Sequence, residues 1–403
     1  FVVQLKLKCD HENLCWELKH STTQFFVLIN SSKQYLTRMF NQISWTPKLL
    51  LAALVGSLMF SAITGNHSKN IAILSSKANA VNQPRQQSGV SQLDRIKNRG
   101  YLICGVNGEL PGFSFVNAEG KYAGIDVDFC RAIAVAIFDD ASQVQFRDVT
   151  TEERFDVLKS GEIDLLSRNT TETLSRDTDG NLDFTPPIFY DAQGVLVNRD
   201  SKIQTLRELA NKTICVPENT TSYDNLQDYL YQAQISAKIL TSDDRETLFD
   251  FYEQNRCQAI TGDISQLIVR KTILANPQDH IILAQHISQE PLAPVLIHQD
   301  SQWFDIVKWV TFTLIQAEEL NINSENINVY HKSKESEIRR FLGMDGTLGS
   351  DMGLTNDFTQ RIIEQVGNYS EIYERNLGQP FGLERGKNAL WKEGGLMYSP
   401  PFD

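Results

Sequence analysis

The stretch FTPPIFYDAQGVLVNRD, residues 184–200, is one long extended run. It is too long for a single buried strand of a small sheet, because such strands have about five or six residues. On its N-terminal side, strand patterns alternate with helix patterns, which predicts βαβ units and a mostly parallel sheet. The predicted elements are the strands YLICGV (101–106), VQFRDV (144–149) and IDLLS (163–167), a loop and hairpin at 109–126, and the helices VDFCRAIAVAIF (127–138) and TTEERFDVLKSGE (150–162).

A second alternating set follows the long run, and a second long extended run, EPLAPVLIHQD (290–300), follows that set. Two βα sets joined by two crossings predict an α/β fold of two lobes. Each lobe is a mostly parallel sheet with flanking helices, the crossings form a two-stranded hinge, and a ligand binds between the lobes. We assign lobe 1 to residues 91–190 and 298–345 and lobe 2 to residues 191–297. Residues 346–403 are a C-terminal helical extension, which packs on lobe 1 or faces a membrane partner.

The composition is that of a globular protein, with 403 residues, 41% hydrophobic and 22% charged. The formal net charge is −12, and the sequence has no block of Lys and Arg. This balance argues against nucleic acid or an anionic membrane surface as the main partner.

The first methionine is Met39, and an apolar run at 49–63 follows it. We interpret residues 1–38 as a segment upstream of the true start and 39–80 as a signal peptide. The apolar run is short for a membrane span, and Ala78-Asn79-Ala80 offers a cleavage site. Residues 81–92 are a polar linker. The alternative is an uncleaved N-terminal anchor, and either reading predicts export.

Four cysteines lie in the body, Cys104, Cys130, Cys215 and Cys257. They include no CxxC pair, so no metal site is expected. In an exported protein an even number of cysteines favours two disulfides, for which three pairings are formally possible. We favour Cys104–Cys130 and Cys215–Cys257, each local to one half of the chain, with buried free thiols as the alternative.

Polar side chains follow three predicted strands. Asn169 and Thr171 come after IDLLS with Arg176 nearby, Thr221 opens a helix after TICVPEN, and Asp263 follows QAIT. An arginine and helix N-terminal amides bind carboxylates, and an aspartate binds ammonium, so the combination fits an amino acid held between the lobes. Taken singly, each residue is more often a helix cap or a surface charge.

Several motifs carry a family resemblance. The segments LDRIKNRGYLICGVNGELPGFSF, GKYAGIDVDFCRAIA, SRNTTETLSRD, TTSYDNL and TGDISQL resemble the polar amino acid solute-binding proteins of bacterial ABC importers. The segments ISQEPLAPV, QWFDIVKWV, EIRRFLG, RIIEQVGNYSEIYERNLG and NALWKEGGLMYSPP are similar to the general L-amino acid binding proteins of that group, the family 3 solute-binding proteins. The resemblance runs from Leu93 to the C-terminus. It implies the two-lobed type II periplasmic-binding-protein fold and delivery of amino acids to a membrane permease powered by a separate ATPase.

The resemblance also implies roles for single residues. Arg176, Thr171 and Asn169 hold the α-carboxylate, with Thr221 near it from lobe 2, and Asp263 holds the α-amino group. Asn169 departs from the family, in which many relatives have serine. In the loop after the first strand, Glu109 or Leu110 replaces the aromatic residue that covers the ligand in many relatives.

Arg154, with Thr151, aligns with a position that contacts the side-chain carboxylate in acidic-selective relatives, and Arg168 is an unassigned neighbour. The alternative for Arg154 is a solvated helix residue beside Glu152 and Glu153. We expect acidic and neutral amino acids as ligands, with basic ones disfavoured.

The remaining expectations concern reaction and location. The sequence has no GxSxG, HExxH, P-loop or GxGxxG motif at a strand–helix junction, so we expect a non-enzyme without cofactor. The alternative is a lyase or dehydratase on the same fold, with Asp263 or Glu109 as a carboxylate base. We expect a monomer in the periplasm of a diderm bacterium, with an L-amino acid and the permease as partners and no nucleic acid.

Overall fold

The computed structural model describes residues 90–178, 181–298 and 300–403. The predicted upstream segment 1–38, the signal peptide 39–80 and residues 81–89 of the linker 81–92 lie outside the described residues. No helix in the described ranges combines the length and the apolar character that crossing a bilayer requires.

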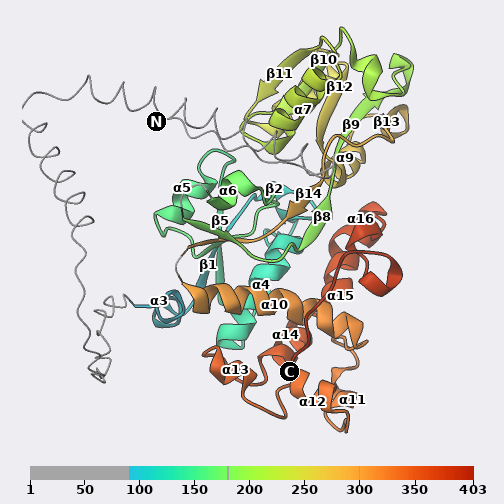
Figure 1. Cartoon of the computed structure of the whole chain (residues 1–403). Coiled ribbons are helices and arrows are strands. Elements are labelled where there is room, and N and C mark those ends of the chain that lie inside the picture. The colour runs from blue at the N-terminus through green and yellow to red at the C-terminus, as the bar shows by residue number, and fades with distance from the viewer. Residues whose placement is uncertain (1–89, 179–180, 299) are drawn as a thin grey trace, which may run out of the picture. The chain divides into compact units, whose positions relative to one another are not determined.

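The described chain alternates strands and helices over most of its length (Figure 1). The strands are β1 Leu102–Val106, β2 Glu109–Leu110, β3 Ser114–Val116, β4 Tyr122–Ala123, β5 Val144–Asp148, β6 Leu165–Leu166, β7 Leu182–Phe184, β8 Phe189–Asp191, β9 Gln193–Asn198, β10 Thr213–Pro217, β11 Lys238–Ser242, β12 Ala259–Asp263, β13 His280–Ile282, β14 Glu290–Leu292 and β15 Val295–Ile297. The α-helices are α3 Gln92–Arg99, α4 Ile125–Phe138, α5 Arg154–Lys159, α6 Leu174–Thr178, α7 Thr221–Gln232, α8 Arg245–Glu253, α9 Ile264–Lys271, α10 Ser301–Glu319, α11 Ile327–Tyr330, α12 Ser336–Phe341, α13 Leu348–Asp351, α14 Phe358–Gln365, α15 Tyr369–Tyr373 and α16 Gln379–Phe381.

Two five-stranded sheets form the two lobes. The lobe 1 sheet has the order β5-β1-β6-β15-β7, and the lobe 2 sheet has the order β11-β10-β12-β9-β13. In the first sheet β15 runs antiparallel to β6 and β7, and in the second β9 runs antiparallel to β12 and β13. The other pairings of both sheets, β1 with β5 and β6 and β10 with β11 and β12, are parallel. The mostly parallel two-lobed fold is confirmed.

The long run 184–200 is divided among three strands. Pro186 and Pro187 separate β7 from β8, because proline lacks the N–H that a ladder needs. The strands β8 and β14 pair antiparallel as a separate two-stranded sheet, which lies between the two larger sheets in Figure 1. This sheet is the predicted hinge. Because β15 already pairs with β6 and β7, the chain is back in the lobe 1 sheet by Val295, earlier than the predicted boundary at 298.

The C-terminal extension packs into lobe 1. Its apolar side chains share one core with β1, α4 and α10, and the helices α14 and α15 lie beside α4 and α10 in Figure 1. Tyr373, a fully buried residue of α15, stacks on Phe189 of the hinge strand β8. Near the end of the extension, the side-chain amide of Asn388 accepts from the N–H of Tyr190 at 2.6 Å and donates to its carbonyl at 3.0 Å. The extension therefore contacts the hinge directly.

The structure forms the disulfides Cys104–Cys130 and Cys215–Cys257, the two pairs favoured from the sequence. The first joins β1 to α4 within the core of lobe 1. The second joins β10 to Cys257, which lies just before β12 in lobe 2. Each lobe thus carries one covalent link between the strand that lies second in its sheet, β1 or β10, and a neighbouring segment.

Candidate functional site

The carboxyl ends of β6, β10 and β12 meet at one pocket between the lobes. Lobe 1 supplies residues of the segment that follows β6 and of α5, and lobe 2 supplies the N-terminus of α7 and residues near β12 and α8. The pocket is lined by Arg154, Asn169, Thr171, Arg176, Thr220, Thr221, Ser222, Arg245 and Asp263. We call it the head-group pocket. Strand ends and helix N-termini of α/β sheets are the usual places for polar ligands.

Asp126 fixes the segment that follows β6. This carboxylate is buried in the first turn of α4 and accepts hydrogen bonds from the Ser167 hydroxyl (3.1 Å) and the Asn169 N–H (3.2 Å). Burial raises the pKa of Asp126 to about 7, and these two hydrogen bonds oppose the rise. Asn169 has a left-handed φ of 39°, which asparagine tolerates better than most residues do. That conformation gives a physical reason for asparagine at this position.

Two guanidinium groups of lobe 1 line the head-group pocket. Arg176 donates from Nη1 to the Thr171 carbonyl at 2.7 Å, which leaves its other N–H groups for a ligand. Arg154 is 5% exposed, and within the described residues its side chain makes no hydrogen bond or ion pair. Both lie near the ring of Phe155, with the Cζ of Arg154 at 4.8 Å and that of Arg176 at 5.8 Å from the ring centroid. Burial lowers the pKa of both, and for Arg154 the charge of Arg176 lowers it further.

Lobe 2 contributes the N-terminus of α7. Thr220 caps this helix by accepting from the Tyr223 N–H, and the Thr221 hydroxyl donates to the buried carboxylate of Glu290 at 3.0 Å. Glu290 lies on the hinge strand β14 and also accepts from the side-chain amide of Asn225 at 2.8 Å. These contacts connect the pocket to the hinge. They also leave the backbone amides of the first turn of α7 at the pocket wall, where they favour an anion.

Asp263 is the buried carboxylate of the head-group pocket. It accepts a hydrogen bond from the side-chain amide of Gln266. Burial raises its pKa, and the charge of Glu290 adds to the rise, whereas Arg245, the Asn169 side chain and Arg176 oppose it. Asp191 of β8 is also buried, and burial together with repulsion from Asp263 raises its pKa.

Arg245 was missed by the sequence interpretation. It is the first residue of α8, is half-buried, and lines both the head-group pocket and the larger pocket beside it. Its neighbours Asp243, Asp244 and Glu246 are exposed, so the local sequence has the charge pattern of a solvated helix start. Nothing in the linear sequence therefore indicated that Arg245 lines a pocket.

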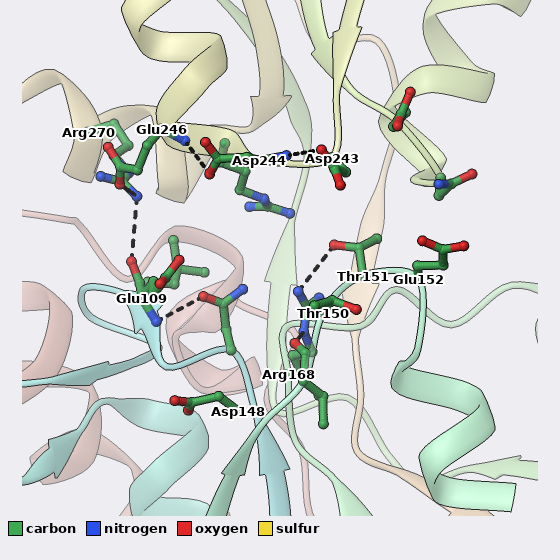
Figure 2. Close-up of a pocket in the computed structure, with 16 residues that line it drawn as sticks. Glu109, Asp148, Thr150, Thr151, Glu152, Arg168, Asp243, Asp244, Glu246 and Arg270 are labelled. Atoms are coloured by element: carbon green, nitrogen blue, oxygen red, sulfur yellow. Dashed lines mark hydrogen bonds and ion pairs between the residues drawn. The ribbon is translucent and has the colours of Figure 1, made fainter.

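The larger pocket is shown in Figure 2. Thr151 lies here and accepts from Arg168 Nη2 at 3.1 Å. Glu109 also lies here, on β2, where its carbonyl accepts from Arg270 Nη2 at 3.5 Å (Figure 2). The structure therefore divides the predicted set. Arg154, Asn169, Thr171, Arg176, Thr221 and Asp263 line the head-group pocket, and Thr151 and Glu109 line its neighbour.

The burial of Arg154 contradicts the alternative that it is a solvated helix residue. The reason is local. The side chain of Glu153 accepts from the Thr150 N–H, and the Glu153 N–H donates to the Thr150 hydroxyl, which holds residues 150–153 in a turn. The helix α5 therefore begins at Arg154 instead of at 150.

Comparison of the sequence with known protein families gives one match. The family model of the bacterial extracellular solute-binding proteins, family 3, matches residues 102–379. The chain belongs to this family.

This solute-binding protein is similar to two relatives along most of their lengths. The general L-amino acid-binding periplasmic protein of Rhizobium johnstonii is 42% identical over 318 residues, which cover 78% of this chain and 93% of the relative. The glutamate/glutamine/aspartate/asparagine-binding protein of Rhodobacter capsulatus is 43% identical over 319 residues, which cover 78% and 94%. Among solved structures, a periplasmic binding protein from Brucella ovis with glutathione bound is 40% identical with a TM-score of 0.76, covering 78% of this chain and all of that one.

Proposed function

We propose that this protein is the extracytoplasmic substrate-binding subunit of an ABC importer, which captures L-amino acids between its lobes and delivers them to a membrane permease. The observation that carries the proposal is the head-group pocket, in which guanidinium groups and a helix N-terminus lie close to a buried aspartate. The relatives from Rhizobium and Rhodobacter, named as binding proteins for amino acids, support it.

The head group of an amino acid fits the two kinds of charge in the pocket. Arg176, with Thr171 and Asn169, holds the α-carboxylate from lobe 1, and the first turn of α7 at Thr221 holds it from lobe 2. Asp263 holds the α-ammonium. Because one ligand is bound by residues of both lobes, it stabilises the closed arrangement.

Arg154 sets the preference for the ligand side chain. A buried guanidinium without a protein partner is costly, and a ligand carboxylate removes that cost. A neutral side chain leaves the cost in place, and a basic one adds repulsion. We therefore propose that acidic and neutral amino acids bind and that basic ones are excluded.

The same reasoning favours binding without turnover. The carboxylate of Asp263 accepts from Gln266, and the charges of Arg245 and Arg176 favour its ionised form, which pairs with an ammonium group. We propose that the protein is a monomer, that it works in the periplasm of a diderm bacterium, and that its permease is powered by a separate ATPase.

Calorimetric titration with a panel of L-amino acids tests the proposal. The purified protein is first freed of bound ligand by partial denaturation and dialysis. We expect micromolar or tighter binding of several acidic and neutral amino acids, without product formation, and loss of binding in Arg176→Ala. A variant Arg176→Ala that binds like the wild type overturns the carboxylate assignment, and turnover of a bound amino acid supports the lyase alternative.

A further inference from the structure

The pocket next to the head-group pocket is large and open. Its cavity volume is about 330 Å³, against about 20 Å³ for the head-group pocket. Arg245 lines both, so the two pockets meet at its side chain. A ligand bound by its head group can therefore extend past Arg245 into the larger pocket, whose volume lies at the lower end of the range of small-molecule sites.

Arg168 contributes a buried cation to the larger pocket. Its side chain is 3% exposed, with Nε donating to the Val149 carbonyl at 2.7 Å and Nη2 to the Thr151 hydroxyl at 3.1 Å (Figure 2). Within the described residues its Nη1 has no hydrogen-bond partner. A buried guanidinium N–H without a partner is rare and costs free energy, which an acceptor brought in by a ligand would recover.

The third arginine of the larger pocket differs from these two. Arg270 forms an ion pair with Glu246, whereas neither Arg168 nor Arg245 forms an ion pair among the described residues. Seven carboxylates also line the pocket, namely Glu109, Asp148, Glu152, Glu218, Asp243, Asp244 and Glu246. All of these except the half-buried Glu218 are exposed, so water screens them, whereas Arg168 is buried. The acidic lining favours a cationic ligand group, and the buried arginine favours an anionic one. Because a buried charge is screened less than an exposed one, the attraction of the arginine for an anion is the stronger of the two.

We propose that Arg168 and Arg245 form a second anion subsite, which binds the distal carboxylate of an amino acid extended through its side chain. The proposal rests on the proposed function. Because both α-groups of the ligand are bound in the head-group pocket, a peptide bond at either of them is excluded, and the extension must leave from the side chain. Among peptides, this describes γ-glutamyl compounds with a free C-terminal carboxylate.

Three ligands that differ only at the far end test the subsite. γ-L-Glutamylglycine carries a distal carboxylate, γ-L-glutamylethylamide carries a methyl group in its place, and N5-(2-aminoethyl)-L-glutamine carries a distal ammonium. Calorimetric titration of the wild-type protein is expected to give γ-L-glutamylglycine an affinity at least about tenfold above that of either analogue, the scale of one charge-assisted contact. A ratio near one, or tighter binding of the ammonium compound, overturns the proposal.

Single substitutions test whether Arg168 and Arg245 cause the preference for a distal carboxylate. In Arg245→Gln and in Arg168→Gln the ratio between γ-L-glutamylglycine and γ-L-glutamylethylamide is expected to fall below about threefold. Arg256→Gln, which removes an exposed charge from the same lobe, is expected to keep the wild-type ratio. Since Arg168 is buried, Arg245→Gln keeps the test valid if Arg168→Gln does not fold, and an unchanged ratio in Arg245→Gln contradicts the subsite.

Titration of wild type with glutamate and glutamine separates this proposal from the proposed function. Binding of these two amino acids without discrimination among the γ-glutamyl ligands removes the subsite and leaves the amino-acid function intact. Absence of binding by every one of the five ligands removes both.

Discussion

The two lobes share one scaffold and differ in chemistry. Both sheets follow the same order once the strand that arrives through the hinge, β15 or β9, is set apart in fourth place: of the other strands, the first in the chain lies second, the next lies at one end, and the third lies in the middle. Each lobe also has one disulfide. Yet lobe 1 presents the guanidinium groups of Arg154 and Arg176, and lobe 2 presents the buried carboxylate of Asp263 with the N-terminus of α7.

Under the proposed function, this difference gives a physical reason why a zwitterionic ligand would close the lobes. Each lobe repeats the same crevice at its strand ends, but only lobe 1 supplies Arg154 and Arg176, and only lobe 2 supplies the carboxylate of Asp263. A ligand with both charges is therefore bound fully only when the lobes meet. Arg245 is the exception, because it brings a guanidinium from lobe 2 to the cationic side.

The largest expected effect is loss of the lobe 2 anion. Asp263→Ala leaves the ligand ammonium buried and unpaired, which costs about 2–5 kcal/mol, or at least about thirtyfold in affinity. Calorimetry with glutamine measures the effect, and Asp250→Ala, an exposed change in the same lobe, is the control. Near-wild-type affinity in Asp263→Ala would show that lobe 2 does not bind the ammonium.

The second-largest effect on ligand affinity is expected from loss of Arg154, the buried cation of lobe 1 that has no partner among the described residues. Arg154→Met is expected to weaken glutamate about tenfold or more relative to alanine, because the side-chain carboxylate loses its partner. The same variant is expected to raise the melting temperature of the ligand-free protein, since a buried unpaired charge costs roughly 1 kcal/mol or more.

Two measurements check this pair of expectations, calorimetry for the ligands and differential scanning calorimetry for the free protein. Equal losses for glutamate and alanine remove Arg154 from the side-chain site. A lower melting temperature would mean that Arg154 stabilises the fold instead of the ligand.

Acidification should weaken binding through lobe 2. Burial raises the pKa of Asp263 in the free protein, and the ligand ammonium requires the ionised carboxylate. Below this raised pKa, glutamine must displace the proton from the Asp263 carboxyl in order to bind. Its affinity should therefore fall by about tenfold as the pH decreases from 7 to 5. The control is 2-oxoglutarate, which lacks the ammonium. Its weak binding should strengthen over the same range, and a parallel fall for both ligands would contradict the assignment.

The smallest effect on the ligand is expected at the contact between the extension and the hinge. Asn388→Ala leaves the N–H and carbonyl of Tyr190 without their partners, which costs about 1–3 kcal/mol in the free energy of unfolding. Urea unfolding measures this cost, with Lys387→Ala, an exposed change on the same turn, as the control. Glutamine affinity should change by less than about threefold. A larger change would assign the extension a part in lobe closure.

The fold and part of the site follow from patterns that sequence shows directly. Alternating strand and helix patterns and the two long runs predict the lobes and the hinge, because burial periodicity and proline placement act locally. The residues Asn169, Thr171, Thr221 and Asp263 could be placed because they follow strands whose carboxyl ends converge.

Other residues depend on tertiary structure. Whether Arg154 is buried depends on where α5 begins, and a turn held by Thr150 and Glu153 decides that start. Arg245 lies in a run of charged residues and lines the pocket because α8 packs beside β10 and β12, a tertiary contact within lobe 2. Asp126, early in α4, supports Asn169 across 43 positions of sequence, a contact that no local pattern shows.

The contact of Asn388 with Tyr190 has a consequence for association between molecules. The strand β8 is paired with β14 on one side, and on its other edge the side chain of Asn388 occupies the N–H and carbonyl of Tyr190, as a neighbouring strand would. An unpaired strand edge is a template for β-sheet addition from another chain. Removal of the last turns of the extension would therefore expose such an edge beside the ligand cleft, and we expect strand exchange between molecules as the result.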